Sequence, residues 1–238
     1  MEEVVKKQRA PLSRERVLRA AVALADERGI EQLSMRKLGQ ELGVEAMSLY
    51  NHVSNKEDIL NGLVEAVAGE IVAAVQGIEP GADARTEWKG VARRRMLAAR
   101  EVMLRHRWAP AVFESRTGIP QPLLGYYDSL LGLLRQGGMS LDLAHHAMHA
   151  LGSRAIGFSQ ELFMKDGDDP DPQTMSAMIM QMGAHYPDLA DLLKIVVHDP
   201  DSTLGGCDDQ FEFEFGLDLL LDGLERLRDA QWRSSEAA

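Results

Sequence analysis

Residues 33–56 carry the pattern that most restricts the fold of this chain, because they predict two short helices joined by a tight turn. Ser34 can cap the first helix, since its hydroxyl can accept a hydrogen bond from a backbone N–H of the first turn. Gly43 stands where a residue in the left-handed conformation ends a helix. The apolar positions of the two helices follow helical spacing and are Met35, Leu38, Leu42, Leu49 and Val53.

The second of these helices has too little apolar surface to be a core element. Its apolar stripe consists of two residues, Leu49 and Val53. Glu45, Ser48 and His52 lie on the opposite side, with Met47 and Asn51 near them. A short helix with a small, polar outward face suits the major groove of DNA. The pair therefore predicts a helix-turn-helix.

Flanking helices complete this unit. Ser13 can cap a helix that ends at Gly29, and Ser54 to Glu57 reads as a capping box that opens a long exit helix. Both helices have an apolar stripe at helical spacing, made of Val17, Ala21 and Leu24 in the first and Leu60, Leu63, Val67 and Ile71 in the second.

Helical patterns continue to the end of the chain, without a strand pattern or a repeat. We expect an all-α protein, with an N-terminal three-helix helix-turn-helix domain and a C-terminal helical bundle, which the family resemblance given below implies is a regulatory domain. The arginines of residues 84–106 are interpreted as a solvated face with Trp88, Val91, Met96 and Leu104 inward; the alternative is a second nucleic-acid surface. The expected segments are a flexible arm (1–11), the helix-turn-helix domain (12–60) and a ligand-binding and dimerisation domain (61–238).

Composition and charge agree with a cytoplasmic DNA-binding protein. Apolar residues make up 45% of the chain, no run of 18 apolar residues exists, and Cys207 is the single cysteine. The net charge is −11, but residues 1–60 hold equal numbers of basic and acidic residues, so the remainder carries the whole excess. Phosphate repels that acidic part, which orients the neutral N-terminal end toward DNA.

The stretch from Gly43 to Lys56 resembles the tetracycline-repressor (TetR) family of bacterial transcriptional regulators. Residues 213–225 are similar to the last helix of the regulatory domain in the branch nearest the tetracycline repressor. The resemblance implies a ligand-responsive homodimeric repressor that binds a palindromic operator in double-stranded DNA. The positions that match the family's DNA contacts are Arg36, Ala46, Met47, Ser48, Tyr50, His52 and Lys56.

A methionine-rich region suggests an effector pocket. Seven of the twelve methionines lie between residues 139 and 182, and methionine suits adaptable apolar pockets as well as ordinary cores. In the tetracycline repressor a histidine holds the drug-bound magnesium, and its place here corresponds to Phe113, so a largely apolar organic effector is expected. The candidate ligand residues are Phe113, Tyr126, Tyr127, Phe158, Glu161, Met175, Met178 and Met182.

Two long helices have faces suited to dimerisation, because small residues let helices approach closely. Packing of the same faces within one chain is the alternative. The candidate interface residues are Ala144, Ala147, Leu151, Ala155, Phe215, Leu219, Gly223 and Leu227.

Other functions have less support. His145 and His149 stand four residues apart, but no further ligand is placed by spacing, so we expect neither a metal site nor a cofactor. An α-helical enzyme carrying a helix-turn-helix would need a paired nucleophile and base or a phosphate loop, and neither is visible. A structural DNA-packaging protein conflicts with the acidic C-terminal part.

Overall fold

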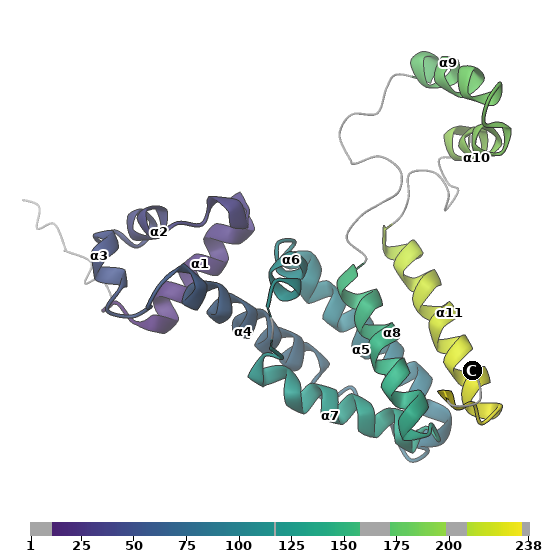
Figure 1. Cartoon of the computed structure of the whole chain (residues 1–238), viewed down its shortest axis with the longest axis horizontal. Helices are drawn as coiled ribbons and strands as arrows, with labels where there is room; N and C mark the ends of the chain where they lie inside the picture. Colours follow the sequence, from purple (N-terminus) through teal and green to yellow (C-terminus); the bar gives the residue numbers. More distant parts are fainter. Residues whose placement is uncertain (1–10, 117, 158–171, 199–208, 235–238) are drawn as a thin grey trace, which may run out of the picture. The chain divides into compact units, whose positions relative to one another are not determined.

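The computed structural model describes residues 11–116, 118–157, 172–198 and 209–234, and every regular element in these ranges is helical (Figure 1). The prediction of an all-α fold is confirmed there. The chain divides into two compact units, Met1–Gly137 and Gly138–Ala238. The expected boundary after residue 60 lies within helix α4 (Lys56–Val75) and stays a prediction. None of the described helices is both long and apolar enough to cross a membrane.

The first unit begins with the predicted helix-turn-helix. Ser13 caps α1 (Arg14–Arg28) by accepting a hydrogen bond from the backbone N–H of Arg16 at 3.2 Å. Gly29 ends that helix with a φ of 81°. The following elements are a 3₁₀ turn (Ile30–Gln32), α2 (Met35–Leu42), α3 (Ala46–Leu49), α4, α5 (Ala84–Arg105), α6 (Ala109–Glu114) and α7 (Gln121–Gln136).

One hydrophobic core runs through this unit from α1 to the start of α7. Its members include Leu24, Leu63, Val102 and Trp108, all with less than a tenth of their surface exposed. Burying an aliphatic side chain of this size stabilises a fold by about 1.5–3 kcal/mol. Helix α4 contacts α1 and also α5, α6 and α7, so it joins the helix-turn-helix to the remaining helices of this unit.

The interpretation of α5 as a helix with a solvated arginine face is partly wrong. Trp88, Val91 and Met96 are buried as expected, but Leu104 is 42% exposed, whereas Arg95 and Arg100 are buried. Arg95 can lie inside because its guanidinium binds the carbonyl of Ile78 at 2.8 Å, the hydroxyl of Ser129 at 3.0 Å and the carboxylate of Glu79 at 2.7 Å. A buried charge with its donors satisfied is tolerated.

The second unit contains two pairs of contacting helices, α8 (Leu141–Gly157) with α11 (Asp209–Asp229) and α9 (Pro172–Gly183) with α10 (Pro187–His198). Helices α8 and α11 run antiparallel, because hydrogen bonds join Asp142 to Ser234 at one end and Arg154 to the carbonyl of Glu212 at the other. Their buried residues are Leu143, Ala144, Ala147 and Leu151 on α8 and Phe213, Leu217, Leu221 and Leu224 on α11.

Candidate DNA-binding and effector sites

Helices α2 and α3 form a tightly packed pair. We call the three helices α1, α2 and α3 the reading head. Ser34 caps α2 by accepting from the N–H of Lys37 at 3.3 Å, and Gly43 ends α2 in the left-handed conformation, with a φ of 67°. Gly39 sets the distance between the two helices. A Cβ there would lie 2.9 Å from the carbonyl oxygen of Val44 and 3.2 Å from the backbone nitrogen of Ala46. Any side chain at this position would therefore push α3 outward.

The predicted DNA contacts lie at the surface of the α2–α3 region and of the first turn of α4. Met47 is 74% exposed, which is unusual for a large apolar side chain, and Tyr50 is 45% exposed. Leu49 and Val53 are buried as predicted. The other predicted contacts are also at the surface: Arg36 and Lys56 are exposed, and Ala46, Ser48 and His52 are half-buried.

The first turn of α4 presents Lys56 beside the reading head. The predicted capping box is wrong in one detail, because the N-cap is Asn55 and not Ser54. The side chain of Asn55 accepts from the N–H of Asp58 at 2.9 Å, while the N–H of Ser54 binds the carboxylate of Asp58 at 2.8 Å. Backbone N–H groups and a cation at a helix N-terminus are the arrangement that binds phosphate.

Asp58 and Glu57, the two carboxylates next to Lys56, are both neutralised. Arg14 on α1 binds Asp58 through two hydrogen bonds of 2.8 and 2.7 Å. The hydrogen bond from Arg14 and that from Ser54 hold the pKa of Asp58 below its ordinary value. Arg116 binds Glu57 at 2.6 Å. The acidic first turn of α4 therefore presents less negative charge to a phosphate than its sequence suggests.

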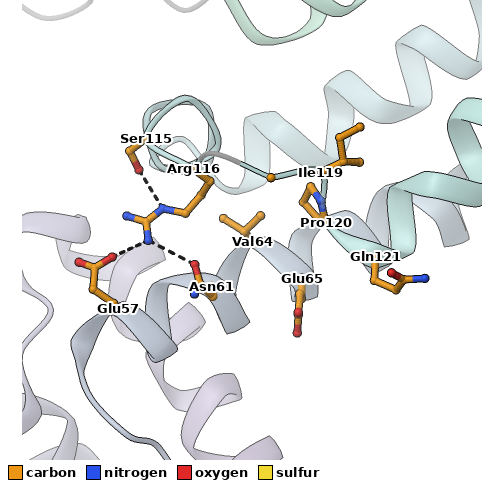
Figure 2. Close-up of a pocket in the computed structure, with 10 residues that line it drawn as sticks. Glu57, Asn61, Val64, Glu65, Ser115, Arg116, Ile119, Pro120 and Gln121 are labelled. Atoms are coloured by element: carbon orange, nitrogen blue, oxygen red, sulfur yellow. Dashed lines mark hydrogen bonds and ion pairs between the residues drawn. The ribbon is translucent and has the colours of Figure 1, made fainter.

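Arg116 also forms one wall of a surface cavity of about 650 Å³ between α4 and the segment that leads into α7. Figure 2 shows its guanidinium reaching toward α4, where it binds Glu57 and, at 3.2 Å, the side chain of Asn61, while Ser115 accepts from its Nε at 3.1 Å. None of the predicted effector residues lines this cavity, whose residues are Glu57, Asn61, Val64, Glu65, Ser115, Arg116, Gly118, Ile119, Pro120 and Gln121.

Only part of the predicted effector pocket lies in the described structure. Phe113, Tyr126 and Tyr127 are all partly buried against the core of the first unit, and the rings of Tyr126 and Tyr127 lie 5.8 Å apart. Met182 is half-buried on α9. Phe158 and Glu161 lie outside the described residues, as do the side chains of Met175 and Met178.

Tyr126 is the more enclosed of the two tyrosines. Burial raises the pKa of its hydroxyl to about 12, although the charge of Arg95 opposes the shift. Burial also raises the pKa of Tyr127. Both hydroxyls are therefore neutral at physiological pH and can donate a hydrogen bond to a ligand.

The predicted dimer residues fall into two groups. Ala144, Ala147 and Leu151 are at most 1% exposed in the single chain, so they pack intramolecularly and are not available to a partner; that part of the prediction is corrected. Small apolar residues also permit close packing within a chain, and this is how α8 uses them. The remaining predicted residues are accessible: Phe215, Leu219 and Leu227 are 55%, 53% and 36% exposed, and Ala155 and Gly223 are half-buried.

Sequence reasoning missed the polar contacts that join distant segments. Arg116 and Glu57 are 59 residues apart, and Asp26 accepts hydrogen bonds from His106 and Trp108, which are 80 and 82 residues away. No spacing rule connects positions so far apart. Among the described residues, no group of three Asp, Glu, His or Cys side chains is placed to hold a metal ion.

This arrangement of helices, with an exposed reading head at the start of a long connecting helix, defines a helix-turn-helix DNA-binding regulator. Residues 17–63 match the family of bacterial regulatory proteins called the tetR family, and residues 79–228 match the tetracyclin repressor-like C-terminal domain. The chain thus belongs to the tetracycline-repressor (TetR) family and is a ligand-responsive, DNA-binding transcriptional regulator.

Relatives cover almost the whole chain. An HTH-type transcriptional regulator from Saccharopolyspora erythraea is 29% identical over 215 residues, which is 90% of this chain and 84% of the relative. Tetracycline repressor protein class D from Escherichia coli is 30% identical over 219 residues, 91% of this chain and 90% of the repressor. The crystal structure of a possible TetR family regulator from Streptomyces coelicolor A3(2) has a TM-score of 0.71 at 29% identity and covers 90% of this chain and 100% of its own.

Proposed function

We propose that this protein is a homodimeric repressor that binds a palindromic operator and is released from it by a small, mainly apolar organic molecule. It acts on double-stranded DNA in the cytoplasm, as a regulator and not as an enzyme. The observation that carries the proposal is the outward face of α3, where the 74% exposed Met47 stands beside Ser48 and Tyr50. An exposed apolar residue among small polar ones can contact a thymine methyl group while its neighbours contact base edges and phosphates.

The charges around this face support contact with DNA. Lys56 is exposed at the N-terminus of α4, and its acidic neighbours Glu57 and Asp58 are held in ion pairs with Arg116 and Arg14. An unpaired carboxylate at that place would repel phosphate. These two ion pairs therefore favour phosphate binding at the first turn of α4.

An exposed apolar stripe on α11 supports a homodimer. Phe211, Phe215, Leu219 and Leu227 are each at least 36% exposed, and they recur at steps of four or eight residues along the helix. Such a row forms a ridge that packs into the groove of a facing helix. Gly223 lies in the same row, and apart from its own stretch of α11 none of the described residues has an atom within 4 Å of the place where its Cβ would stand, so a second helix can approach closely there.

The partly buried aromatic residues Phe113, Tyr126 and Tyr127 support an organic effector. Phe113 replaces the histidine that the resemblance to the tetracycline repressor would require for magnesium, and Tyr126, which packs against the same core, offers a neutral hydroxyl. Several relatives are tetracycline repressors, which favours an effector with rings. We propose a mainly apolar organic effector with rings that binds without magnesium.

The route from effector to DNA runs through the segment after α6. Phe113 lies on α6, and Arg116, immediately after that helix, is bonded to Glu57 and Asn61 in the first turns of α4. A ligand that displaces the end of α6 would move the start of α4 and, with it, the reading head. A tenfold loss of operator affinity requires about 1.4 kcal/mol of coupling between the two sites.

Gly223 provides the test of the dimer. Replacing Gly223 with Arg places a charged side chain in open space within one chain, so the fold is retained, but it blocks close approach of a second chain. Light scattering at micromolar concentration should give a dimer for the wild type and a monomer for this variant. Gly125→Arg is the matched control, because Gly125 also has open space around it and lies on α7. A monomeric wild type, or a Gly223→Arg variant that remains dimeric, contradicts the proposed assembly.

A further inference from the structure

The surface cavity between α4 and the segment that leads into α7 is not used by the proposed DNA and effector sites. Its volume of about 650 Å³ lies within the range of about 300–1,000 Å³ that is usual for small-molecule sites. All of its lining residues belong to the first unit. They include none of the predicted DNA contacts and none of the predicted effector residues. The cavity is therefore a candidate ligand site of its own.

One wall of the cavity is a row of polar side chains on α4. Glu57, Asn61 and Glu65 follow one another at steps of four residues, so they lie on the same face of the helix. With a rise of about 1.5 Å per residue, the row extends along the helix for roughly 12 Å. Val64 adds an apolar side chain to this wall, and Figure 2 shows it facing the segment that leads into α7. The wall thus combines oxygen acceptors with an apolar surface.

The opposite wall is mainly apolar. It includes Gly118, Ile119 and Pro120, which precede α7 (Figure 2). Ile119 is 58% exposed, so much of its side chain is free to be covered. A molecule that removes this surface from water gains free energy through the hydrophobic effect. A ligand with an apolar body therefore fits between Val64 and this wall.

The charges of the lining do not cancel. Three of the lining residues are charged, and Arg116 binds Glu57 at 2.6 Å, which balances that pair. Glu65 forms neither an ion pair nor a hydrogen bond with the described part of the chain. Its charge acts on Arg14, but Arg14 is itself bound to Asp58 through two hydrogen bonds. The cavity thus keeps one negative charge, at Glu65, which attracts a cation and repels an anion.

We propose that this cavity binds a small organic cation, in which an ammonium or amidinium group is attached to an apolar body. The cationic group binds the carboxylate of Glu65, and the body packs between Val64 and Ile119. This inference goes beyond the proposed function and does not depend on operator binding or on the effector. A ligand in the cavity would contact both of the segments that Arg116 joins, so it supplies a second small-molecule input to the start of α4.

Three indole compounds that differ in the charge of their end group test the proposal. They are tryptamine, which is a cation at pH 7, tryptophol, which is neutral, and indole-3-propionate, which is an anion. Isothermal titration calorimetry on the full-length protein should give about tenfold tighter binding for tryptamine than for tryptophol, because a charge-assisted hydrogen bond is gained. Indole-3-propionate should bind most weakly. Glu65→Gln keeps the shape of the side chain and removes its charge, so it should lower the affinity for tryptamine to that for tryptophol.

Two further variants show where the cation binds. Ile119→Lys places a positive charge in the apolar wall at an exposed position, so it should abolish tryptamine binding while the melting temperature of the free protein is retained. Glu101→Gln is the matched control, because Glu101 is an exposed carboxylate on α5 that does not line the cavity; it should bind tryptamine as the wild type does. Equal binding of the three compounds, no binding at millimolar concentration, or tryptamine binding that survives both Glu65→Gln and Ile119→Lys overturns the inference. None of these results bears on operator binding.

Discussion

Arg116 gives the sharpest quantitative prediction about how the first unit is held together. Its side chain is 19% exposed and reaches from the end of α6 to the first turns of α4, where it binds Glu57 and Asn61 (Figure 2). Replacing Arg116 with Met keeps the length of the aliphatic chain and removes every hydrogen bond that the guanidinium makes. Replacing Glu57 with Gln removes the charge of the partner and keeps its shape.

The expected size of the effect follows from the exposure of the two partners. A fully exposed ion pair contributes about 0–1 kcal/mol, and a hydrogen bond to a charged group about 1.5–3 kcal/mol when it is sheltered. Arg116 is sheltered, but Glu57 is 66% exposed. The contribution of this pair should therefore lie near the upper end of the range of about 0–1 kcal/mol for exposed ion pairs. We expect Arg116→Met to lower the free energy of unfolding by about 1–2 kcal/mol, with a coupling to Glu57 of about 0.5–1 kcal/mol.

Urea unfolding of the wild type, the two single variants and the double variant measures this coupling. The control is Arg19→Met, because Arg19 pairs with Glu15 on α1 where both side chains are more than 70% exposed; this change should cost less than about 0.5 kcal/mol. If the two single variants are additive within error, the ion pair does not join α6 to α4, and the proposed route from effector to reading head loses its main contact.

Three further predictions concern DNA, pH and ligand. Ser48→Ala should lower operator affinity by roughly 1–3 kcal/mol, because one base contact is lost. Lys56→Ala should weaken binding to all sequences alike and reduce the slope of log affinity against log salt concentration by about 1. Titration of labelled duplexes measures both effects, and equal affinity of Ser48→Ala and wild type would refute the placement of the DNA-binding face. Arg14 lowers the pKa of Asp58. The contribution of Asp58 to stability is therefore present above the ordinary aspartate pKa of about 4 and is lost as the pH falls below it. Below that pH, the unfolding free energy of Asp58→Asn should vary less with pH than that of the wild type. Apolar aromatic compounds should raise the melting temperature without magnesium, and a strict requirement for magnesium would contradict the role given to Phe113.

The reading head could be predicted from sequence because its determinants are local. Ser13, Ser34 and Gly43 act on the helix next to them, and the structure has all three in the expected roles. The N-cap of α4 was misplaced by one residue because Ser54 and Asn55 are both good caps. The choice depends on Asp58, which accepts the N–H of Ser54 and is itself held by Arg14 from α1. A contact 44 residues away thus decided a local feature.

Features that depend on contacts between distant segments could not be predicted. Arg95 resembles its exposed neighbours in the sequence, and its burial follows from acceptors at Ile78, Glu79 and Ser129. Ala144 and Ala147 form a stripe that suits a partner chain or a neighbouring helix equally well. Sequence periodicity states that a face is apolar, but the element that covers it is set by the path of the chain.

Selection of bound sequences from random double-stranded DNA by the full-length protein tests the central claim most directly. The account predicts an enriched inverted repeat whose half-sites are centred about one helical turn, or a multiple of it, apart, since each protomer of a dimer presents one reading head to the major groove. Recovery of no preferred sequence, or of a single half-site without its inverted copy, would contradict a homodimeric operator-binding regulator.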